Sequence, residues 1–365
     1  MTEIQLTKLG KSFGAFTALA DMTMTISSGE FVALLGPSGC GKSTTMNMIA
    51  GMLEPTEGDI LFDGRSILNV PMAKRGVGFV FQNYAIFSHM NVRQNLAYGL
   101  HGRGLSAAQR SEKVAQIADF LQLTDLLDRP AAGLSVNILQ RVAIGRSAVV
   151  EPAIFLLDEP LSNVDAAFRA VMRTELKTLQ RQFQQTMVYV THDQLEAMTM
   201  ADRIAVMDHG KLLQVGTPIE VYNHPVNTFV ARFLGSPGMN ILPATVPADG
   251  GVLHLGSVGT AQVPAGHCLA SSGSTEPFGF GFRPEQVVPD PDGTMAMPCV
   301  FVERIGARRI LHLEADDAVV KASFDHDTPV PKVGEIFRFS VASEHVRLFD
   351  AEGLALPVAP LREAA

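Results

Sequence analysis

The sequence predicts an α/β domain over residues 1–235 and a smaller β-rich domain over residues 236–365. Short apolar runs at 31–35, 153–157, 187–190 and 204–207 have the composition of buried parallel strands. Amphipathic stretches separate these runs, and this alternation of strand and helix signals is typical of α/β folds. After Gly235 the helix signals largely stop, which predicts a domain boundary at the break Ser236-Pro237-Gly238.

Helices of the first domain are predicted from apolar spacing and from capping residues. A stretch that begins near Ser106 carries apolar residues at helical spacing up to Leu121. A second stretch places five apolar residues on roughly one face: Phe168, Val171, Leu176, Leu179 and Phe183. Thr217 and Glu220 form a capping box with Pro218 between them, which predicts a short helix near the end of this domain.

The second domain is predicted to be small, β-rich and barrel-like. Its alternating segments lie at 278–282, 299–303, 309–314, 318–324, 336–341 and 346–349, with Gly, Pro and Asp clusters between them. Hydrophobic residues make up 47% of the 365 residues and charged residues 18%, so the chain is expected to be globular.

Charge and cysteine content argue against several classes of protein. The net charge of -8 and the pI near 5.7 argue against nucleic acid or anionic lipid as the main partner. Cys40, Cys268 and Cys299 have no metal or disulfide spacing and fit a reducing cytoplasm. No signal peptide is visible, and no apolar run reaches the ~18 residues that span a bilayer. A membrane role is therefore expected at the cytoplasmic surface, through another chain.

The segment GPSGCGKS at 36–43 matches the phosphate-binding loop pattern between a predicted strand and a helical stretch. Glycines let backbone N–H groups wrap around phosphate oxygens, and the helix N-terminus adds partial positive charge. Lys42 is expected to reach the β- and γ-phosphates, and the Ser43 hydroxyl to ligate Mg²⁺. Roughly one or two such chains per hundred would match by chance, and the strand and helix context lowers this. We therefore predict that Mg²⁺-ATP is bound by Gly36, Pro37, Ser38, Gly39, Cys40, Gly41, Lys42, Ser43 and Thr44.

Polar residues follow two of the predicted strands. Asp158 directly follows the run at 153–157. An acid at the carboxyl end of such a strand points into the crevice where α/β sheets bind ligands, so Asp158 can hold magnesium. Glu159 can act as the general base on the attacking water. Alone, such acids are equally often solvated strand-end residues, and the phosphate loop decides for the functional interpretation. His192 would by spacing alone be a structural histidine, but its place after a neighbouring strand allows a γ-phosphate contact.

The order of these motifs over residues 1 to about 235 resembles the ATP-binding cassette (ABC) family. This resemblance implies that Phe13 stacks on adenine and that His192 is the switch histidine. It implies that Gln82 is the glutamine that touches magnesium and senses the membrane partner. Asp165 resembles the acid of the D-loop, and residues from about 84 to 150 correspond to a helical subdomain inserted in the nucleotide core.

The C-terminal part resembles the regulatory domain of ATPases that drive maltose-type and glycerol-phosphate-type importers. The resemblance lies in Gly235-Ser236-Pro237, Met239-Asn240 and Phe282-Arg283-Pro284-Glu285. It implies an OB-like regulatory domain and an ATP-hydrolysing energy subunit that imports a carbohydrate, polyol or related small solute. The implied partners are two transmembrane permease subunits, a second ABC ATPase and, indirectly, an extracytoplasmic solute-binding protein. The implied location is the cytoplasmic face of the plasma membrane.

The signature motif departs from the family pattern. Ser135 is retained, but Val136-Asn137-Ile138 stands where the family has Gly-Gly-Gln. In the family, two cassettes face each other and Ser135 would contact the partner's ATP in trans. Val136 adds a branched side chain where backbone approaches phosphate, Asn137 tolerates a left-handed backbone, and Ile138 cannot replace the hydrogen bonds of glutamine. A heterodimer with a regular partner and a symmetric homodimer both remain open.

Two other function classes compete with the importer subunit. A soluble ABC ATPase acting on DNA or ribosomes is disfavoured by the acidic balance and by the lack of a basic arm. A non-catalytic regulatory partner that binds ATP with weak turnover is disfavoured by the presence of both Glu159 and His192.

Overall fold

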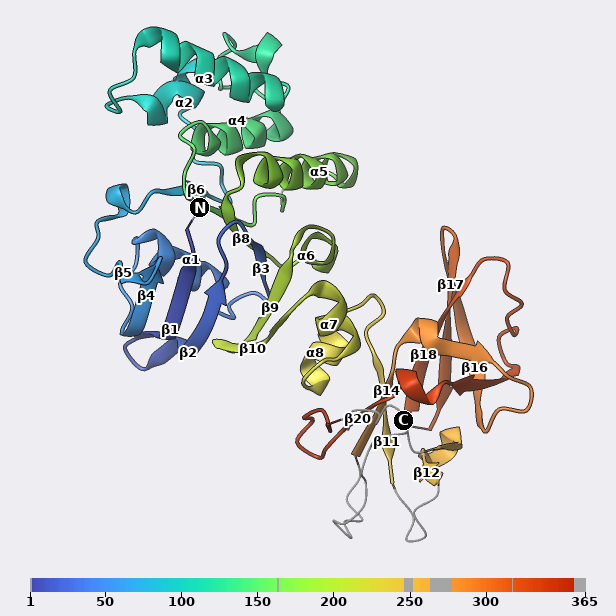
Figure 1. Ribbon diagram of the computed structural model, residues 1–365. Helices are drawn as coiled ribbons and strands as arrows, with labels where there is room; N and C mark the ends of the chain where they lie inside the picture. The colour runs from blue at the N-terminus through green and yellow to red at the C-terminus, as the bar shows by residue number, and fades with distance from the viewer. Residues whose placement is uncertain (1, 163, 246–251, 263–277, 317, 358–365) are drawn as a thin grey trace, which may run out of the picture. The chain divides into compact units, whose positions relative to one another are not determined.

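The computed structural model describes residues 2–162, 164–245, 252–262, 278–316 and 318–357 (Figure 1). Two compact units divide the chain, Met1–Ile219 and Glu220–Ala365. This division comes before the predicted boundary at Gly235, because helix α8 (Thr228–Phe233) is bound within the second unit. There the fully buried Arg283 guanidinium donates to the carbonyls of Ala231 and Leu234 at the end of α8. The break at 236–238 therefore lies inside the second unit.

A six-stranded sheet forms the centre of the first unit, in the order β10-β9-β3-β8-β7-β6. Only β10 is antiparallel to its neighbour among these strands. The strands are β3 (Phe31–Leu35), β6 (Val77–Val80), β7 (Ile154–Asp158), β8 (Thr186–Thr191), β9 (Arg203–Asp208) and β10 (Lys211–Gly216). The four predicted apolar runs are confirmed as β3, β7, β8 and β9. Both β3 and β8 are buried along their whole length, which explains their continuous apolar sequences.

An antiparallel sheet in the order β2-β1-β4-β5 belongs to the same unit. Its strands are β1 (Ile4–Phe13), β2 (Phe16–Ile26), β4 (Glu57–Phe62) and β5 (Arg65–Ser66). Apolar residues of β1 and of β3 share one core with helix α1 (Lys42–Ala50), whose Met46, Met48 and Ile49 are fully buried. The packing of α1 between the two sheets fixes where the loop at its N-terminus lies.

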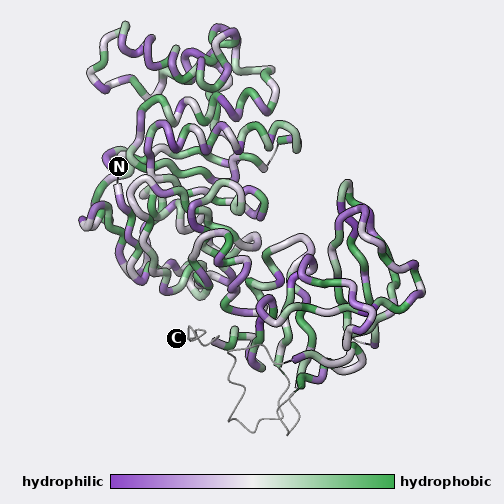
Figure 2. Tube along the Cα trace, turned by 45° about the vertical axis from the view of Figure 1, so that its right-hand side comes forward, coloured by the Kyte–Doolittle hydropathy of each residue, from purple (hydrophilic) through white to green (hydrophobic). Residues whose placement is uncertain are grey.

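Three helices of the first unit fall in the range 84–150, and Figure 1 draws them together beyond the β6 edge. They are α2 (Val92–Ala97), α3 (Ala107–Phe120) and α4 (Val136–Ala148). The predicted start near Ser106 is confirmed, since Ser106 caps α3 and forms a capping box with Gln109. The tube in Figure 2 alternates between hydrophilic and hydrophobic colours along these helices, as expected for amphipathic helices packed on a core.

Helix α5 (Ala166–Phe183) corrects one predicted core position. Leu176 and Leu179 are buried as predicted, but Val171 is 46% exposed and Met172 is fully buried in its place. At 3.6 residues per turn, Val171 lies about 140° from Leu176 around the helix, whereas Met172 lies about 40° away. The predicted face was therefore too wide on one side. Helix α6 (Gln194–Met200) follows β8.

The second unit is β-rich, as predicted. It also contains α8 and the part of α7 (Pro218–Asn223) from Glu220 onward. Its described sheets have the orders β11-β14-β20, β12-β13 and β15-β19-β16-β17-β18. Their strands are β11 (Asn240–Ala244), β12 (Val252–His254), β13 (Thr260–Gln262), β14 (Phe278–Phe282), β15 (Val287–Pro289), β16 (Met295–Ile305), β17 (Arg308–Ala315), β18 (Ala318–Asp325), β19 (Ile336–Val341) and β20 (Arg347–Phe349). Phe280, Phe282 and Phe339 centre its core. Cys40 and Cys299 are buried free thiols, while Cys268 lies outside the described residues.

Candidate active site

The candidate residues are brought together by three adjacent parallel strands. In the sheet order, β3, β8 and β7 are neighbours. The phosphate loop follows β3, Asp158 and Glu159 stand at the end of β7, and His192 follows β8. Because the carboxyl ends of parallel strands meet at one edge, the three segments meet where α/β sheets bind ligands.

Backbone geometry explains why the phosphate loop requires glycine. A Cβ on Gly36 would lie 2.2 Å from the Met207 carbonyl oxygen, and Gly41 has a φ of +103°. Neither position accepts an ordinary side chain without a shift of the backbone. Lys42 is 5% exposed, and its Nζ donates to the Gly36 and Pro37 carbonyl oxygens at 2.7 and 2.8 Å. Backbone carbonyl groups of the loop therefore hold the Lys42 ammonium inside the loop.

The first residue pair of the site joins the loop to the end of β7. The Ser43 hydroxyl donates to Asp158 Oδ1 at 3.0 Å. Burial raises the pKa of the Asp158 carboxyl above its ordinary value, while the hydrogen bond from Ser43 opposes that shift. Two oxygen ligands of the kind that hard divalent cations prefer therefore lie side by side.

Glu159 lies at the centre of the three residues predicted to be catalytic. Gln82 Nε2 donates to Glu159 Oε2 at 3.4 Å, and His192 Nδ1 lies 3.1 Å from the same oxygen. The backbone of Glu159 is left-handed, with a φ of +43°, and its N–H donates to the Val190 carbonyl at 3.0 Å. Such a conformation is unfavourable for a residue with a side chain, and the neighbouring strand β8 holds it in place. The three side chains predicted from separate motifs therefore converge on one carboxylate.

Phe13 lies at the end of β1, at the turn into β2, and is 52% exposed. Lys11 Nζ stands 5.1 Å from the centre of its ring. An exposed aromatic face of this kind can stack on a planar base.

The variant signature forms a link that sequence reasoning missed. Asn137 lies in the first turn of α4 with a helical backbone, so its tolerance of the left-handed conformation is not used. Its Nδ2 donates to Asp165 Oδ2 at 3.2 Å, while Asp165 Oδ1 accepts the Phe168 N–H and caps α5. These hydrogen bonds, that from Phe168 first, lower the pKa of Asp165. Ile138 packs against the core, and Val136 is 44% exposed.

Ser135 is the N-cap residue of α4, and among the described residues its side chain makes no capping hydrogen bond. The first amides of α4 and the Ser135 hydroxyl are therefore available to an anion that approaches from outside the chain. Of the D-loop segment 162–165, Asn163 lies outside the described residues.

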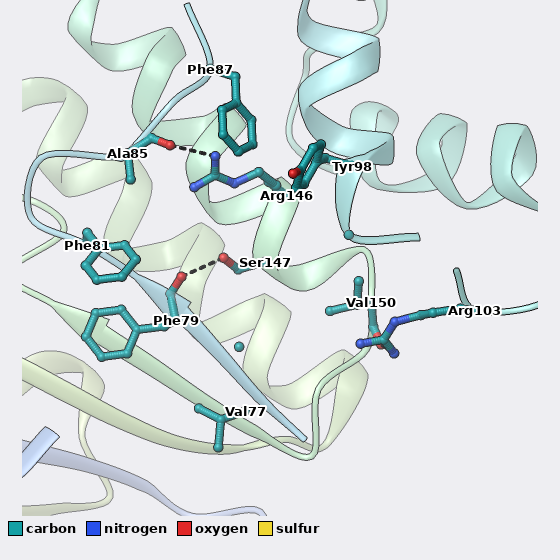
Figure 3. Close-up of a pocket in the computed structure, with 12 residues that line it drawn as sticks. Val77, Phe79, Phe81, Ala85, Phe87, Tyr98, Arg103, Arg146, Ser147 and Val150 are labelled. Carbon is teal, nitrogen blue, oxygen red and sulfur yellow. Dashed lines mark hydrogen bonds between the residues drawn. The ribbon is translucent and has the colours of Figure 1, made fainter. Parts of the chain in front are cut away.

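A cavity of about 430 Å³ lies where β6 meets the helices, and it is the second feature that the sequence did not predict (Figure 3). Apolar rings of Phe81, Phe87 and Tyr98 line it. Arg146 of α4 donates to the Ala85 carbonyl at 2.7 Å and lies over the Phe87 ring at 5.1 Å. Because Ala85 follows Gln82 by three residues, the wall of this cavity is continuous with the segment that carries Gln82.

The phosphate loop contacts Asp158 through Ser43, and the neighbouring Glu159 is contacted by Gln82 and His192. This arrangement at the ends of parallel strands, beside an inserted helical region, is that of an ABC-type ATPase. The sequence profile of the family described as ABC transporter matches residues 19–162. The chain is 45% identical to the sn-glycerol-3-phosphate import ATP-binding protein UgpC of Jannaschia sp. (strain CCS1), over 96% of this chain and 99% of that protein. It therefore belongs to the family of ABC import ATP-binding proteins, and it is an ATP-binding ATPase.

Two further relatives support this assignment. The maltose/maltodextrin import ATP-binding protein MalK of Photorhabdus laumondii is 41% identical over 97% of each chain. The solved structure of cbiO1 from Clostridium perfringens, part of an ABC transporter complex, is similar with a TM-score of 0.56 and 29% identity. It covers 60% of this chain and 89% of its own length.

Proposed function

We propose that this chain is the energy subunit of an importer for a carbohydrate, polyol or related small solute. The observation that carries the proposal is similarity over nearly the whole chain to import proteins named for sn-glycerol-3-phosphate and for maltose. The described part of the chain contains no helix that is long and apolar enough to cross a membrane. By similarity to these import proteins, the subunit would act peripherally, at the cytoplasmic face of the plasma membrane, on two transmembrane permease subunits. An extracytoplasmic solute-binding protein would act with it indirectly.

Mg²⁺ fits the oxygen atoms at the end of β7. Ser43 and Asp158 would hold it, with Gln82 as a further ligand. Mg²⁺ commonly takes its remaining ligands from nucleotide phosphates and water. The positive charge of a cation would also offset the cost of burying the charged Asp158 carboxylate. When bound, the ion supplies positive charge beside the phosphates.

The remaining residues bind and orient the reactants. Lys42 places positive charge on the β- and γ-phosphates, and Phe13 stacks on the adenine. Glu159 takes a proton from the attacking water. Gln82 donates a hydrogen bond to its carboxylate and His192 Nδ1 lies within 3.1 Å of the same oxygen, and both would keep the carboxylate aimed at that water. Ser135 and Asp165 would act in trans, on the ATP of a second ABC ATPase.

The cavity in Figure 3 is the proposed docking site for a permease segment. Its lining is mostly apolar, which suits the apolar face of a short helix. Arg146, in the wall of the cavity, donates a hydrogen bond to the Ala85 carbonyl. A segment that docks against Arg146 would therefore also displace the backbone between Ala85 and Gln82. Permease contact and the catalytic carboxylate would thus be coupled over a few residues.

The test uses the complex of this chain with its permease subunits. Tyr98 is 49% exposed at the cavity, and Tyr98→Asp places an unpaired charge on its apolar lining. A docked permease segment would have to desolvate that charge, at a cost of at least ~1.4 kcal/mol, and this free energy corresponds to a tenfold change in the docking equilibrium. Solute-stimulated ATP hydrolysis is therefore expected to fall about tenfold or more. ATP affinity should stay within about twofold. Phe301→Asp, at an exposed aromatic of the second unit, is the matched control and should change neither quantity.

Full solute stimulation in Tyr98→Asp would refute the docking site. ATP hydrolysis that responds to no solute but to DNA or ribosomes would instead support the soluble ABC ATPase. Binding of ATP with no turnover in the complete complex would support the regulatory partner.

We further propose that the second ATPase of the complex is a different chain with a Gly-Gly-Gln signature. Val136 is exposed at the signature position, where the family arrangement would bring the backbone close to a partner's γ-phosphate, and Asn137 donates a hydrogen bond to Asp165 of its own chain. We expect mass analysis of the purified importer to find one copy of this chain and one of the partner. Glu159→Gln should then remove most activity, and the equivalent change in the partner little. An active importer with two copies of this chain would contradict the heteromer.

A further inference from the structure

A buried ion cluster supports the loop that carries His192. Glu196, in the first turn of α6, has a side chain that is 4% exposed. Its Oε2 accepts hydrogen bonds from the Tyr189 hydroxyl at 2.8 Å and the Thr191 hydroxyl at 2.7 Å. Its Oε1 lies 3.7 Å from Nε of Arg169. Burial of an isolated carboxylate would cost several kcal/mol, and the contacts with these three partners offset that cost.

The cluster fixes the backbone on both sides of His192. The Thr191 hydroxyl donates to Glu196 and accepts the Asp193 N–H at 2.9 Å. The Asp193 carboxylate accepts the N–H groups of Leu195 and Glu196 and pairs with Arg169 at 3.1 Å. His192 is therefore the residue between two anchored neighbours, with its own ring 3.1 Å from Glu159.

Arg169 extends the cluster to the segment that follows Glu159. Its Nη2 donates to the Val164 carbonyl at 3.2 Å, and Val164 directly precedes Asp165. One small cavity is bordered by Glu159 and His192 as well as by Arg169 and Glu196. The ion cluster and the catalytic pair therefore share a boundary. Because the Arg169 guanidinium contacts both the Val164 carbonyl and the Asp193 carboxylate, a displacement of that carbonyl would also move the loop that carries His192.

We propose that Glu196 is a positioning residue for ATP hydrolysis, which together with Arg169 sets the His192 loop against the segment at Val164. The inference rests on the proposed role of His192. It predicts an effect on turnover but not on nucleotide affinity, because the Glu196 carboxylate contacts Tyr189, Thr191 and Arg169 and not the phosphate loop.

The experiment is a double-mutant cycle in the assembled complex, with Glu196→Gln, His192→Ala and the double variant. Glu196→Gln keeps the shape of the side chain and removes its charge. We expect it to lower kcat about tenfold with KM for ATP unchanged within about twofold. We expect the double variant to be no slower than His192→Ala alone, because Glu196 is proposed to act only through His192 and has no further effect once His192 is removed. Thr191→Val, which breaks the hydroxyl link without removing the charge, should lower kcat in the same way.

Asp202→Asn is the matched control. Asp202 is likewise a carboxylate bound to a cation of α5, Lys177 at 2.7 Å, and to a backbone N–H, that of Phe31 at 2.9 Å. Phe31 begins β3, so this pair stands at the opposite edge of the sheet from the site. Its loss should leave kcat unchanged, and thermal unfolding reports the stability of every variant.

Losses that multiply in the double variant would overturn the inference, because Glu196 would then act independently of His192. A changed KM with an unchanged kcat would overturn it too. If Glu196→Gln does not fold, the same criteria apply to Thr191→Val paired with His192→Ala. Full turnover in His192→Ala would refute the proposed role of His192 itself, and this inference with it. That result is distinct from a multiplicative cycle, which refutes the inference alone.

Discussion

Replacing Glu159 by glutamine is expected to lower ATP turnover by roughly 10²–10⁴-fold while ATP still binds. The amide has the shape of the carboxylate and can still accept the hydrogen bond from Gln82, so the site should keep its geometry. An amide nitrogen cannot take the proton of the attacking water, and this is the function that the variant loses. The effect should therefore lie in kcat.

Turnover at saturating ATP and equilibrium binding of ATP, both measured in the assembled complex, check this prediction. Glu175→Gln is a suitable control, because Glu175 is also a largely buried carboxylate, 3.1 Å from Arg141 of α4. The control reports the cost of losing a buried charge away from the Glu159 carboxylate. Unchanged turnover in Glu159→Gln would show that another group activates the water.

Replacing Lys42 by alanine is expected to abolish tight ATP binding, raising Kd by about 100-fold or more. The ammonium is held in the phosphate loop by two carbonyl oxygens and is nearly inaccessible to solvent. Hydrogen bonds to a charged group contribute about 1.5–3 kcal/mol each, and in the proposed site Lys42 contacts two phosphates. Loss of two such bonds corresponds to at least two decades in affinity.

Titration of the purified chain with ATP measures this effect, and thermal unfolding without nucleotide shows whether the loop still folds. Lys177→Ala removes another ammonium that is paired within the first unit, with Asp202, and should bind ATP normally. Wild-type affinity in Lys42→Ala would contradict the assignment of the phosphate loop.

Local signals in the sequence were sufficient for the framework of the first unit. Strands β3 and β8 are buried throughout, so their apolar runs are visible in any short window. Ser106 and Gln109 mark the start of α3 because a capping box is completed within one turn. The convergence of the segments carrying Asp158 and His192 also followed from sequence, since each follows a parallel strand and such strands end at one edge.

Contacts between distant segments were decided only by the tertiary structure. The hydrogen bond from Asn137 to Asp165, the pairing of Arg169 with Glu196, and the cavity beside Arg146 join residues from different elements. Similarly, α8 belongs with the second unit because Arg283, far along the chain, binds its last carbonyl groups. Side-chain partners of this kind depend on the angles at which elements pack, and periodicity within one element carries no information about those angles. Periodicity and motif therefore determined the strands, the phosphate loop and the class of chemistry, whereas packing determined which buried charges lie beside the proposed catalytic carboxylate.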